Sequence, residues 1–447
     1  MRRPAGQNAQ LEVQIGKPDY LLLGATVALL LLGTIMVYSA SFVVAHNEFN
    51  DDAYFLLRQL MWVAVGVGAM FLGYRIDYHR WRRFSLPIML LCLGLLVAVL
   101  VPGIGTRSYG AVRWIRVGPL LQVQPSELAK IAIVLYLADW LARREQVVGN
   151  LGKGLIPFAI IVGSLAWLVE MQPDLGTVSI IVGTAACVFF VAGANLLHVG
   201  ALGAGGVLAG LTVVSHLSGY RQGRITAFLD PWSDIQGSGW HTAQGLIALG
   251  SGGAFGVGLG DGHQKFYWVP NAHTDAIFAI IGEELGFLGA LGVLALFAVL
   301  TWRGFLHAWR APDAFGRLFG TGLTCLLGLQ ALINIAVVTN SVPYTGVTLP
   351  LVSFGGSSTV ISMLAVGLLL NLSRYRCRLI PTAPARPEPA PSWTPRLARW
   401  HVERVVSHAR RGPSTAHPIA ASRRLDTGAR SVRRLYRSRR AFEARDD

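Results

Sequence analysis

Residues Tyr20 to Ala45 have the sequence YLLLGATVALLLLGTIMVYSASFVVA, which contains no charged side chain. An α-helix of about 20 apolar residues is long enough to cross a bilayer, so this segment predicts a membrane-spanning helix. The stretches 84–106, 175–220 and 318–373 are equally free of charged residues. With 53% hydrophobic and 14% charged residues among 447, the chain is too apolar for an ordinary soluble enzyme and is typical of an integral membrane protein.

The long apolar stretches predict an all-α fold, that of a polytopic membrane protein with about ten transmembrane helices. The expected spans lie near residues 20–45, 54–74, 84–102, 125–142, 155–170, 177–194, 197–217, 275–302, 318–340 and 358–373. They form a membrane domain at 19–375, which includes a large external loop at 218–274 between the seventh and eighth spans. A cytoplasmic arm at 1–18 precedes this domain, and a basic tail at 376–447, which we expect to be disordered, follows it.

The positions of the positive charges predict which side of the membrane each loop faces. Cytoplasmic loops carry an excess of Lys and Arg, and alternate connections of this chain are rich in both. The charges on that side are Arg2, Arg3, Lys17, Arg75, Arg80, Arg82, Arg83, Arg143, Arg144, Lys153, Arg303, Arg310 and Arg317. An even number of spans then places both termini in the cytoplasm.

Most of the formal net charge of +15 belongs to the C-terminal tail. From Arg374 onward the chain has 18 Arg and six acidic residues, which accounts for +12 of that charge. A basic segment next to a membrane, here with Trp393 and Trp400, is typical of contact with anionic lipid headgroups. A solvated tail that only fixes the topology explains the same charges. Neither interpretation needs nucleic acid, so we expect membrane lipids and no nucleic acid as partners.

Two external segments carry positive charge, although Lys and Arg are expected mainly in cytoplasmic loops. Their cations are Arg107, Arg113 and Arg116 in 103–124, and Arg221, Arg224 and Lys265 in 218–274. An anionic ligand such as a pyrophosphate explains cations on this side of the membrane. Short-range pairing with the acids of the larger loop is the structural alternative, and these acids are Asp230, Asp234 and Asp261.

The densest group of ionisable residues lies in GLGDGHQKFYWVPNAHTDAIFAIIGEELG, residues 258–286. A bilayer accommodates such residues only at a cost, so a cluster of them marks a candidate site. From the residues alone, Asp275 is typical of the N-cap of the following helix. Glu283 and Glu284 lie two turns further along, where we expect them to pair within the bundle.

Four further polar segments accompany this one. They are QPSELAK (124–130), EMQPDLGT (170–177), YRQGRITAFLDPW (220–232) and PYTGVTLPLVSFGGSS (343–358). In the first, Glu127 and Lys130 lie one turn apart on a helix, so either a substrate contact or a structural ion pair explains them. In the last, the prolines and glycines prevent a regular helix, and broken backbone at membrane depth is tolerated where it lines a cavity.

The order and spacing of these five segments resemble those of the SEDS family (shape, elongation, division and sporulation). The resemblance extends from about residue 18 to 375. The family pattern HTDFIFA-x-x-GEELG corresponds to residues 273–286, where Ala276 stands in place of a common Phe. The pattern NGARRWI corresponds to residues 109–115, where the Asn and one Arg are replaced, so Arg113 is the arginine expected to act there.

The resemblance implies a peptidoglycan glycosyltransferase that polymerises lipid II at the outer face of a bacterial cytoplasmic (inner) membrane. Asp275 corresponds to the proposed catalytic carboxylate of the family, a general base for the acceptor sugar, with undecaprenyl pyrophosphate as the leaving group. The residues expected to bind the substrate are Arg113, Glu127, Lys130, Asp174, Arg224, Lys265, His273 and Ser353. We expect a divalent cation (Mg²⁺ or Mn²⁺) on the pyrophosphate, with its protein ligands left open, and no organic cofactor.

The partners that the resemblance implies are lipid II, the nascent glycan chain, a class B penicillin-binding protein that crosslinks it, and other division proteins. The wording FLDPWSD at 228–234 and GVGLGDGHQK at 256–265 resembles division members more than elongation members, which indicates the division septum. A role in elongation is an alternative. Ten spans with buried charges also suit a lipid II flippase, and the tail suits a non-catalytic division scaffold.

Overall fold

The computed structural model describes residues 9–108, 111–118, 121–144, 148–195, 197, 200, 203, 205–206 and 220–381. One compact unit runs from Ala9 to Ile380, and the architecture below belongs to it. The second unit consists of Met1–Asn8 and Pro381–Asp447, nearly all of which lies outside the described residues. Most of the predicted disordered tail, from residue 382 onward, and most of the predicted seventh span, 197–217, therefore also lie outside them, while residues 376–381 form a strand.

In the described part of the chain, helices occupy nine of the ten predicted spans, and the all-α class is confirmed. The long helices are α1 (Tyr20–Phe49), α2 (Tyr54–Arg75), α4 (Ser85–Leu100), α5 (Pro125–Ala142), α6 (Ile156–Glu170), α7 (Leu175–Val191), α11 (Ile277–Trp309), α12 (Ala314–Val338) and α13 (Gly356–Ser373). The shorter ones are α3 (Tyr78–Arg83), α9 (Tyr220–Leu229) and α10 (Trp240–Ser251). A π-helical turn, η2 (Leu151–Leu155), leads into α6.

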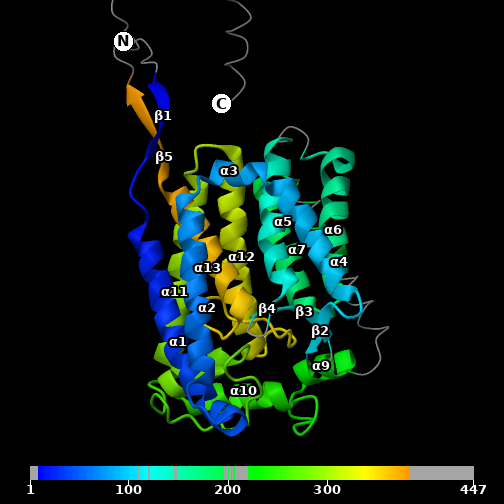
Figure 1. The fold of residues 1–447 in the computed structure, drawn as a ribbon, viewed down its shortest axis with the longest axis vertical. Helices are drawn as coiled ribbons and strands as arrows, with labels where there is room; N and C mark the ends of the chain where they lie inside the picture. Colours follow the sequence, from blue (N-terminus) through cyan, green and yellow to red (C-terminus); the bar gives the residue numbers. More distant parts are fainter. Residues whose placement is uncertain are drawn as a thin grey trace, which may run out of the picture. The chain divides into compact units, whose positions relative to one another are not determined.

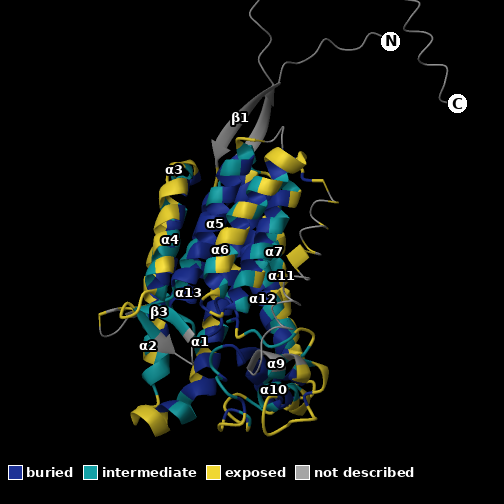
Figure 2. Cartoon of the chain, turned by 90° about the vertical axis from the view of Figure 1, so that its right-hand side faces the viewer, coloured by how far each residue is buried: buried dark blue, intermediate teal, exposed yellow. Residues whose placement is uncertain are grey.

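Among the described residues, six helices are long and apolar enough to cross a membrane: α1, α2, α6 with its π-helical turn, α11, α12 and α13. α5 is more polar because it carries Glu127, Lys130 and Asp139, yet nearly all of its side chains are buried. Figure 2 shows exposed residues along α4 and α6 and buried ones along α5. A charged helix can occupy the inside of this bundle because protein, rather than lipid, surrounds it.

The helices form a bundle with two different ends (Figure 1). α12 contacts α5, α7, α11 and α13, while α1 packs against α11 and α2 packs against α13. α3 lies at one end, and α9 and α10 lie at the opposite end, which we call the α10 end. Connections that carry the polar sequence segments, including 339–355 between α12 and α13, reach the α10 end.

The described residues also form five short strands, which the apolar patterning did not predict. At the α10 end, β2 (Gly105–Ser108), β3 (Ala111–Val117) and β4 (Leu121–Val123) form an antiparallel sheet. The β3 sequence, AVRWIRV, contains the β-branched and aromatic residues typical of strands. β1 (Ala9–Ile15) pairs with β5 (Tyr375–Pro381), so the segments that flank the bundle in sequence lie at the same end of it, as an even number of spans requires.

Close packing between α1 and the segment before α13 depends on Gly33. A β-carbon on Gly33 would lie 2.5 Å from Val352 Cα and 2.6 Å from the Val352 carbonyl oxygen, whereas Gly24 on the same helix has no atom within 4 Å of that position. We expect Gly33→Ala to lower the free energy of unfolding by about 1–3 kcal/mol, because backbone must move to make room. Gly24→Ala should leave it unchanged or raise it. Thermal unfolding in detergent measures both, and equal effects would contradict the contact.

Candidate functional site

Asp275 lies at the α10 end of the bundle, two residues before α11 begins. Its carboxylate accepts a hydrogen bond of 2.9 Å from the Thr274 hydroxyl and another from the Tyr344 hydroxyl. Its backbone carbonyl accepts a bond of 2.7 Å from Asn334 Nδ2. The N-cap residue of α11 is Ala276, and no side chain bonds the first amides of that helix. The helix-cap interpretation of Asp275 is therefore wrong.

A small pocket lies beside Asp275, between α10, α11 and α12. Its walls are formed by His241, Thr242, Gly245, Ala276, Ala279, Val337, Val338 and Tyr344. The pocket has room for about one water molecule. The Asp275 carboxylate, which belongs to a residue only 7% exposed, consequently has little water around it.

Burial controls the ionisation of the groups around Asp275. Removal from water disfavours the charged carboxylate and raises the pKa of Asp275, although His241, Thr274 and Arg224 oppose this shift. Burial also lowers the pKa of His241, and it lowers the pKa of His273 to about 4. Both imidazoles are therefore neutral near pH 7, and Asp275 is the group whose raised pKa suits acid–base chemistry.

Arg224 of α9 supplies positive charge near this carboxylate. Its guanidinium donates a hydrogen bond of 3.3 Å to the Tyr344 carbonyl, and its Cζ lies 5.3 Å from the centre of the Tyr344 ring. The His241 ring lies 4.2 Å from the same tyrosine ring. Tyr344 thus joins three groups from different elements, and we call Asp275, Arg224, His241 and Tyr344 the Asp275 cluster.

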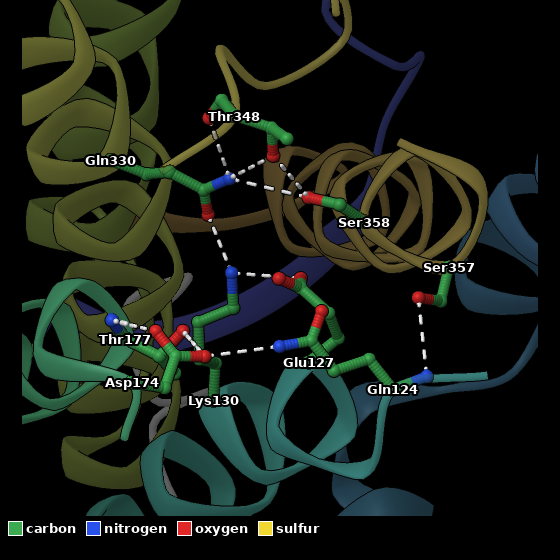
Figure 3. Close-up of polar contacts among 9 residues, drawn as sticks. All are labelled: Gln124, Glu127, Lys130, Asp174, Thr177, Gln330, Thr348, Ser357 and Ser358. Atoms are coloured by element: carbon green, nitrogen blue, oxygen red, sulfur yellow. Dashed lines mark hydrogen bonds and ion pairs between the residues drawn. The ribbon is translucent and has the colours of Figure 1, made fainter. Parts of the chain in front are cut away.

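A second buried polar group lies between α5 and α12 (Figure 3). Lys130 Nζ is 2.7 Å from Glu127 Oε2 and 2.7 Å from Gln330 Oε1. The Gln330 amide nitrogen donates to the Thr348 carbonyl at 3.1 Å and to Ser358 Oγ at 3.3 Å. The structural ion pair that the sequence allowed is therefore present, while the substrate contacts of Glu127 and Lys130 stay predictions.

Asp174 lies beside this pair, at the start of α7. Its carboxylate accepts bonds from the Thr177 backbone N–H at 3.1 Å and from the Thr177 hydroxyl at 2.9 Å. The Gln124 amide donates to Asp174 Oδ2 at 3.0 Å, and the Gln124 backbone N–H donates to Ser357 Oγ at 3.4 Å. Figure 3 shows these side chains converging from α5, α7, α12 and α13. We call Gln124, Glu127, Lys130, Asp174 and Gln330 the Lys130 cluster.

α12 connects the two clusters. Gln330 and Asn334 are four residues apart in this helix, so they lie on one face, one turn from each other. Gln330 belongs to the Lys130 cluster, whereas Asn334 donates to the carbonyls of Asp275 and Val347, at 2.7 Å each. Five of the predicted residues consequently gather around α12, and these are Glu127, Lys130, Asp174, Arg224 and Asp275.

Arg113 holds the small sheet against the turn before α7. Its Nε donates to the Gln172 carbonyl at 2.8 Å, and its second terminal nitrogen donates to the Pro173 carbonyl. The adjacent residue, Asp174, belongs to the Lys130 cluster. Arg113 therefore positions this turn, and a contact with substrate phosphate stays a prediction.

His273 and Ser353 join the segments that precede α11 and α13. The His273 ring lies 4.4 Å from the Phe55 ring and 5.6 Å from the Phe354 ring, and its carbonyl accepts a bond of 2.9 Å from the Phe354 backbone N–H. Ser353 Oγ accepts a bond of 2.8 Å from the Leu349 backbone N–H. The His273 carbonyl and the Ser353 hydroxyl thus hold the backbone of these segments, and the predicted contacts of both residues with substrate stay predictions.

Lys265 lies outside both clusters, in an ion pair with Glu284 of α11. Its Nζ is 2.7 Å from Glu284 Oε1, 2.6 Å from the Gly260 carbonyl and 3.3 Å from Ser39 Oγ. Both side chains of the pair are 0% exposed. Glu283 accepts bonds from two backbone N–H groups of the same loop. A phosphate could reach Lys265 only by breaking these bonds, so the geometry gives it a structural place instead of the predicted ligand contact.

Four members of the two clusters were not predicted as site residues, namely Tyr344, His241, Gln330 and Gln124, and neither was Asn334, which bonds the Asp275 carbonyl. Gln330 and Asn334 carried a signal, because two amides four residues apart inside an apolar span mark a polar face. Tyr344 follows Asp275 by 69 positions, and His241 lies on a separate short helix. No local pattern in the sequence connects either of them to Asp275.

A divalent cation would need ligands from more than the protein. Among the described residues, no group of three or more His, Cys, Asp or Glu side chains is placed to hold a metal ion. Mg²⁺ commonly takes one or two carboxylates and obtains its other ligands from phosphate and water. The expected divalent cation therefore stays a prediction, in which a substrate pyrophosphate would supply part of the ligands.

The Lys265–Glu284 pair predicts a large cost for removing one partner. Lys265→Met leaves a buried carboxylate unpaired, and we expect it to lower the free energy of unfolding by about 3–5 kcal/mol. Combining it with Glu284→Leu removes both charges and should restore much of that loss. Thermal unfolding of purified variants in detergent measures both.

The exposed His46–Asp52 pair is the matched control for this prediction. Asp52→Asn should cost at most about 1 kcal/mol, because water screens exposed charges. A double variant that is no more stable than Lys265→Met alone would contradict the assignment of a closed pair.

The sequence model of a family described as cell cycle proteins, which groups FtsW, RodA and SpoVE, matches residues 20–378. The stage V sporulation protein E of Bacillus subtilis (strain 168) is 45% identical over 358 residues, which cover 80% of this chain and 97% of that protein. A probable peptidoglycan glycosyltransferase FtsW of Trichlorobacter lovleyi is 43% identical over 362 residues, covering 80% of this chain and 94% of that protein.

Two solved structures have a similar fold. The crystal structure of the rod shape determining protein RodA of Thermus thermophilus has a TM-score of 0.59 at 29% identity and covers 80% of this chain and 97% of its own. A chain of a peptidoglycan synthase complex, solved to explain how polymerization and crosslinking are coordinated, has a TM-score of 0.65 at 29% identity, with 80% and 98% covered. Because the family match extends over most of its length, this chain belongs to the cell cycle protein family of FtsW, RodA and SpoVE.

Proposed function

We propose that this chain is a peptidoglycan glycosyltransferase that joins lipid II units into glycan strands. Relatives named as probable peptidoglycan glycosyltransferases FtsW, at 43% and 41% identity over most of the chain, support the reaction class. The catalytic assignment rests on one observation, the Asp275 carboxylate buried beside a pocket and held by two hydroxyl groups.

The reaction that suits this geometry uses Asp275 as a general base. Asp275 accepts the proton of the acceptor sugar 4-hydroxyl while that oxygen attacks the anomeric carbon of the donor. The bond from the anomeric carbon to the undecaprenyl pyrophosphate breaks, and the pyrophosphate leaves with the electron pair. A raised pKa favours this role because the carboxylate binds the proton more strongly than an ordinary aspartate does. One base and no covalent intermediate give inversion, from an α-linked donor to a β-1,4 product.

Arg224 is the cation that we assign to the departing pyrophosphate. It lies beside Tyr344, which also bonds the Asp275 carboxylate, so base and cation share one support. A guanidinium binds phosphate oxygens with two parallel hydrogen bonds, which stabilises the charge that develops as the bond breaks. We assign a second contact with the substrate to Lys130 of α5, which bonds Gln330 of α12.

The apolar helices and the family make this a multi-pass inner membrane protein. We place both termini in the cytoplasm and the α10 end at the outer face, as the distribution of Lys and Arg in the loops favours. The peptidoglycan synthase complex with a similar chain coordinates polymerization with crosslinking. By analogy, we propose that a class B penicillin-binding protein is the partner of this chain. We propose that the two proteins act at the division septum.

Asp275→Asn should lower the rate of polymerisation by about 100- to 10,000-fold, because an amide cannot accept the proton. The assay follows glycan polymer made from labelled lipid II in detergent, where the substrate is accessible and no transport step is needed. Asp261→Asn removes an exposed carboxylate from the loop before α11 and should keep the wild-type rate. Wild-type polymerisation by Asp275→Asn would refute the base, whereas the absence of polymer from the wild-type protein would favour the flippase.

The raised pKa of Asp275 predicts how the rate depends on pH. Only the ionised carboxylate accepts a proton, so kcat rises with pH through the raised pKa and is constant above it. We expect kcat to rise at a pH above about 3.9, the ordinary pKa of aspartate, because burial raises the pKa of Asp275. Tyr344→Phe removes a hydrogen bond to the charged form and should move the rise to still higher pH. If kcat rises near pH 4 and Tyr344→Phe does not shift that rise, a group other than Asp275 controls the dependence of kcat on pH.

A further inference from the structure

α11 changes its surroundings at Gly286. The backbone there has φ 68° and ψ −167°, which interrupts the helix after its first turns. On one side of the break, residues 277–284 are all buried. On the other side, Phe287, Leu288 and Leu291 are exposed. The apolar surface that lipid can contact therefore begins at the break.

A neighbouring segment satisfies the backbone groups that the break leaves open. The N–H groups of residues 257 and 258 donate to the carbonyls of residues 283 and 284, at 3.0 and 3.1 Å. The N–H groups of residues 287 and 288 donate to the carbonyls of residues 253 and 254, at 2.9 and 3.1 Å. The contact is so close that a β-carbon on Gly256 would lie 2.1 Å from the Glu284 carbonyl oxygen. Residues 253–258 thus lie at the same depth as the break.

Two polar contacts between α1 and α11 indicate where the break at Gly286 lies relative to the membrane. At one end, Asp19 is 2.6 Å from Arg303, and at the other, Ser39 Oγ is 2.7 Å from Glu284. Asp19 and Ser39 are 20 residues apart, which corresponds to about 30 Å of helix. Glu284 and Arg303 are 19 residues apart, which corresponds to about 28 Å. The hydrocarbon core of a bilayer is also about 30 Å thick. We take the Ser39–Glu284 contact as one boundary of that core.

The loop beside this boundary exposes apolar and aromatic side chains. They are Phe255, Val257, Leu259, Phe266, Tyr267 and Trp268, of which Phe255 is 81% exposed. Phe266 packs edge-on against Phe42 of α1 at 6.2 Å, and Trp268 stacks on Trp240 of α10 at 5.8 Å. These contacts, with the Lys265–Glu284 pair, hold the loop in place. We call residues 253–268 the aromatic loop.

We propose that the aromatic loop is a membrane anchor, which inserts its exposed side chains into the boundary between headgroups and acyl chains of a phospholipid bilayer. Trp and Tyr gather at this boundary because they combine an apolar ring with a polar group. The exposed apolar surface of the loop continues into Phe287 and Leu288, on the lipid side of the break. Asp261 and His263 are also exposed, which requires the headgroup region and excludes the hydrocarbon core.

The anchor has a consequence for the reaction, and this part rests on the proposed function. Asp275 follows Trp268 by only seven residues, so a loop fixed in the headgroup region holds the base near the level of a lipid-linked pyrophosphate. The anchor itself does not depend on the reaction. Its test therefore measures contact with lipid and not activity.

The test uses spin labels on full-length protein in phosphatidylcholine–phosphatidylglycerol nanodiscs. The four native cysteines are replaced by alanine, and Phe255→Cys, Leu259→Cys and Ser233→Cys are labelled singly. Ser233 lies exposed in a polar turn of the same external region and is the matched control. Collision with oxygen, which dissolves in lipid, is compared with collision with a nickel chelate, which stays in water. Thermal unfolding shows that each variant is folded.

We expect the ratio of oxygen to nickel collisions to be several-fold higher at positions 255 and 259 than at position 233. A ratio equal to that of position 233 would place the loop in water and overturn the anchor. Low collision with both reagents at 255 and 259 would show that protein covers the loop, and it would overturn the anchor as well.

Discussion

Two amide side chains of α12 hold irregular backbone inside the bundle, and the rest of the site depends on this. The interior of a membrane offers no hydrogen-bond partners, so the protein itself must satisfy the backbone of the segment before α13. Gln330 bonds the Thr348 carbonyl at 3.1 Å, and Asn334 bonds the Val347 carbonyl at 2.7 Å. Without these amides, burying that segment would leave carbonyl groups without partners, at a cost of about 1–3 kcal/mol each.

The same contacts set the position of the reacting group. Asn334 also bonds the Asp275 carbonyl, so one side chain fixes both the segment that carries the carboxylate and the segment that carries Tyr344. Tyr344 in turn bonds the Asp275 carboxylate and lies beside Arg224. A movement of α12 therefore carries the base and its hydrogen-bond donor together. Their relative geometry, on which proton transfer depends, is preserved while the surrounding loops adjust.

The sequence predicted the features that depend on composition or on local pattern. Apolar stretches predicted nine of the described helices, because hydropathy averaged over some 20 residues is insensitive to detail. The prediction that Asp275 is catalytic came from the resemblance of residues 273–286 to a family pattern, since the local sequence alone favoured a helix cap. Tyr344 was not predicted, because its contact spans 69 positions and arises only when α10, α11 and α12 pack together. Lys265 shows a different limit of the sequence. Its charge suggested a phosphate ligand, and only the folded loop reveals that Glu284 neutralises it.

Two buried lysine–glutamate pairs of the same composition differ in what they hold. Lys265 and Glu284 bond the backbone of the aromatic loop, including both the N–H and the carbonyl of Gly260. Opening that pair would release backbone groups into a site without water. Lys130, by contrast, bonds the side chains of Glu127 and Gln330. The Lys265–Glu284 pair therefore fixes the backbone of a loop, whereas the Lys130–Glu127 pair links side chains of α5 and α12.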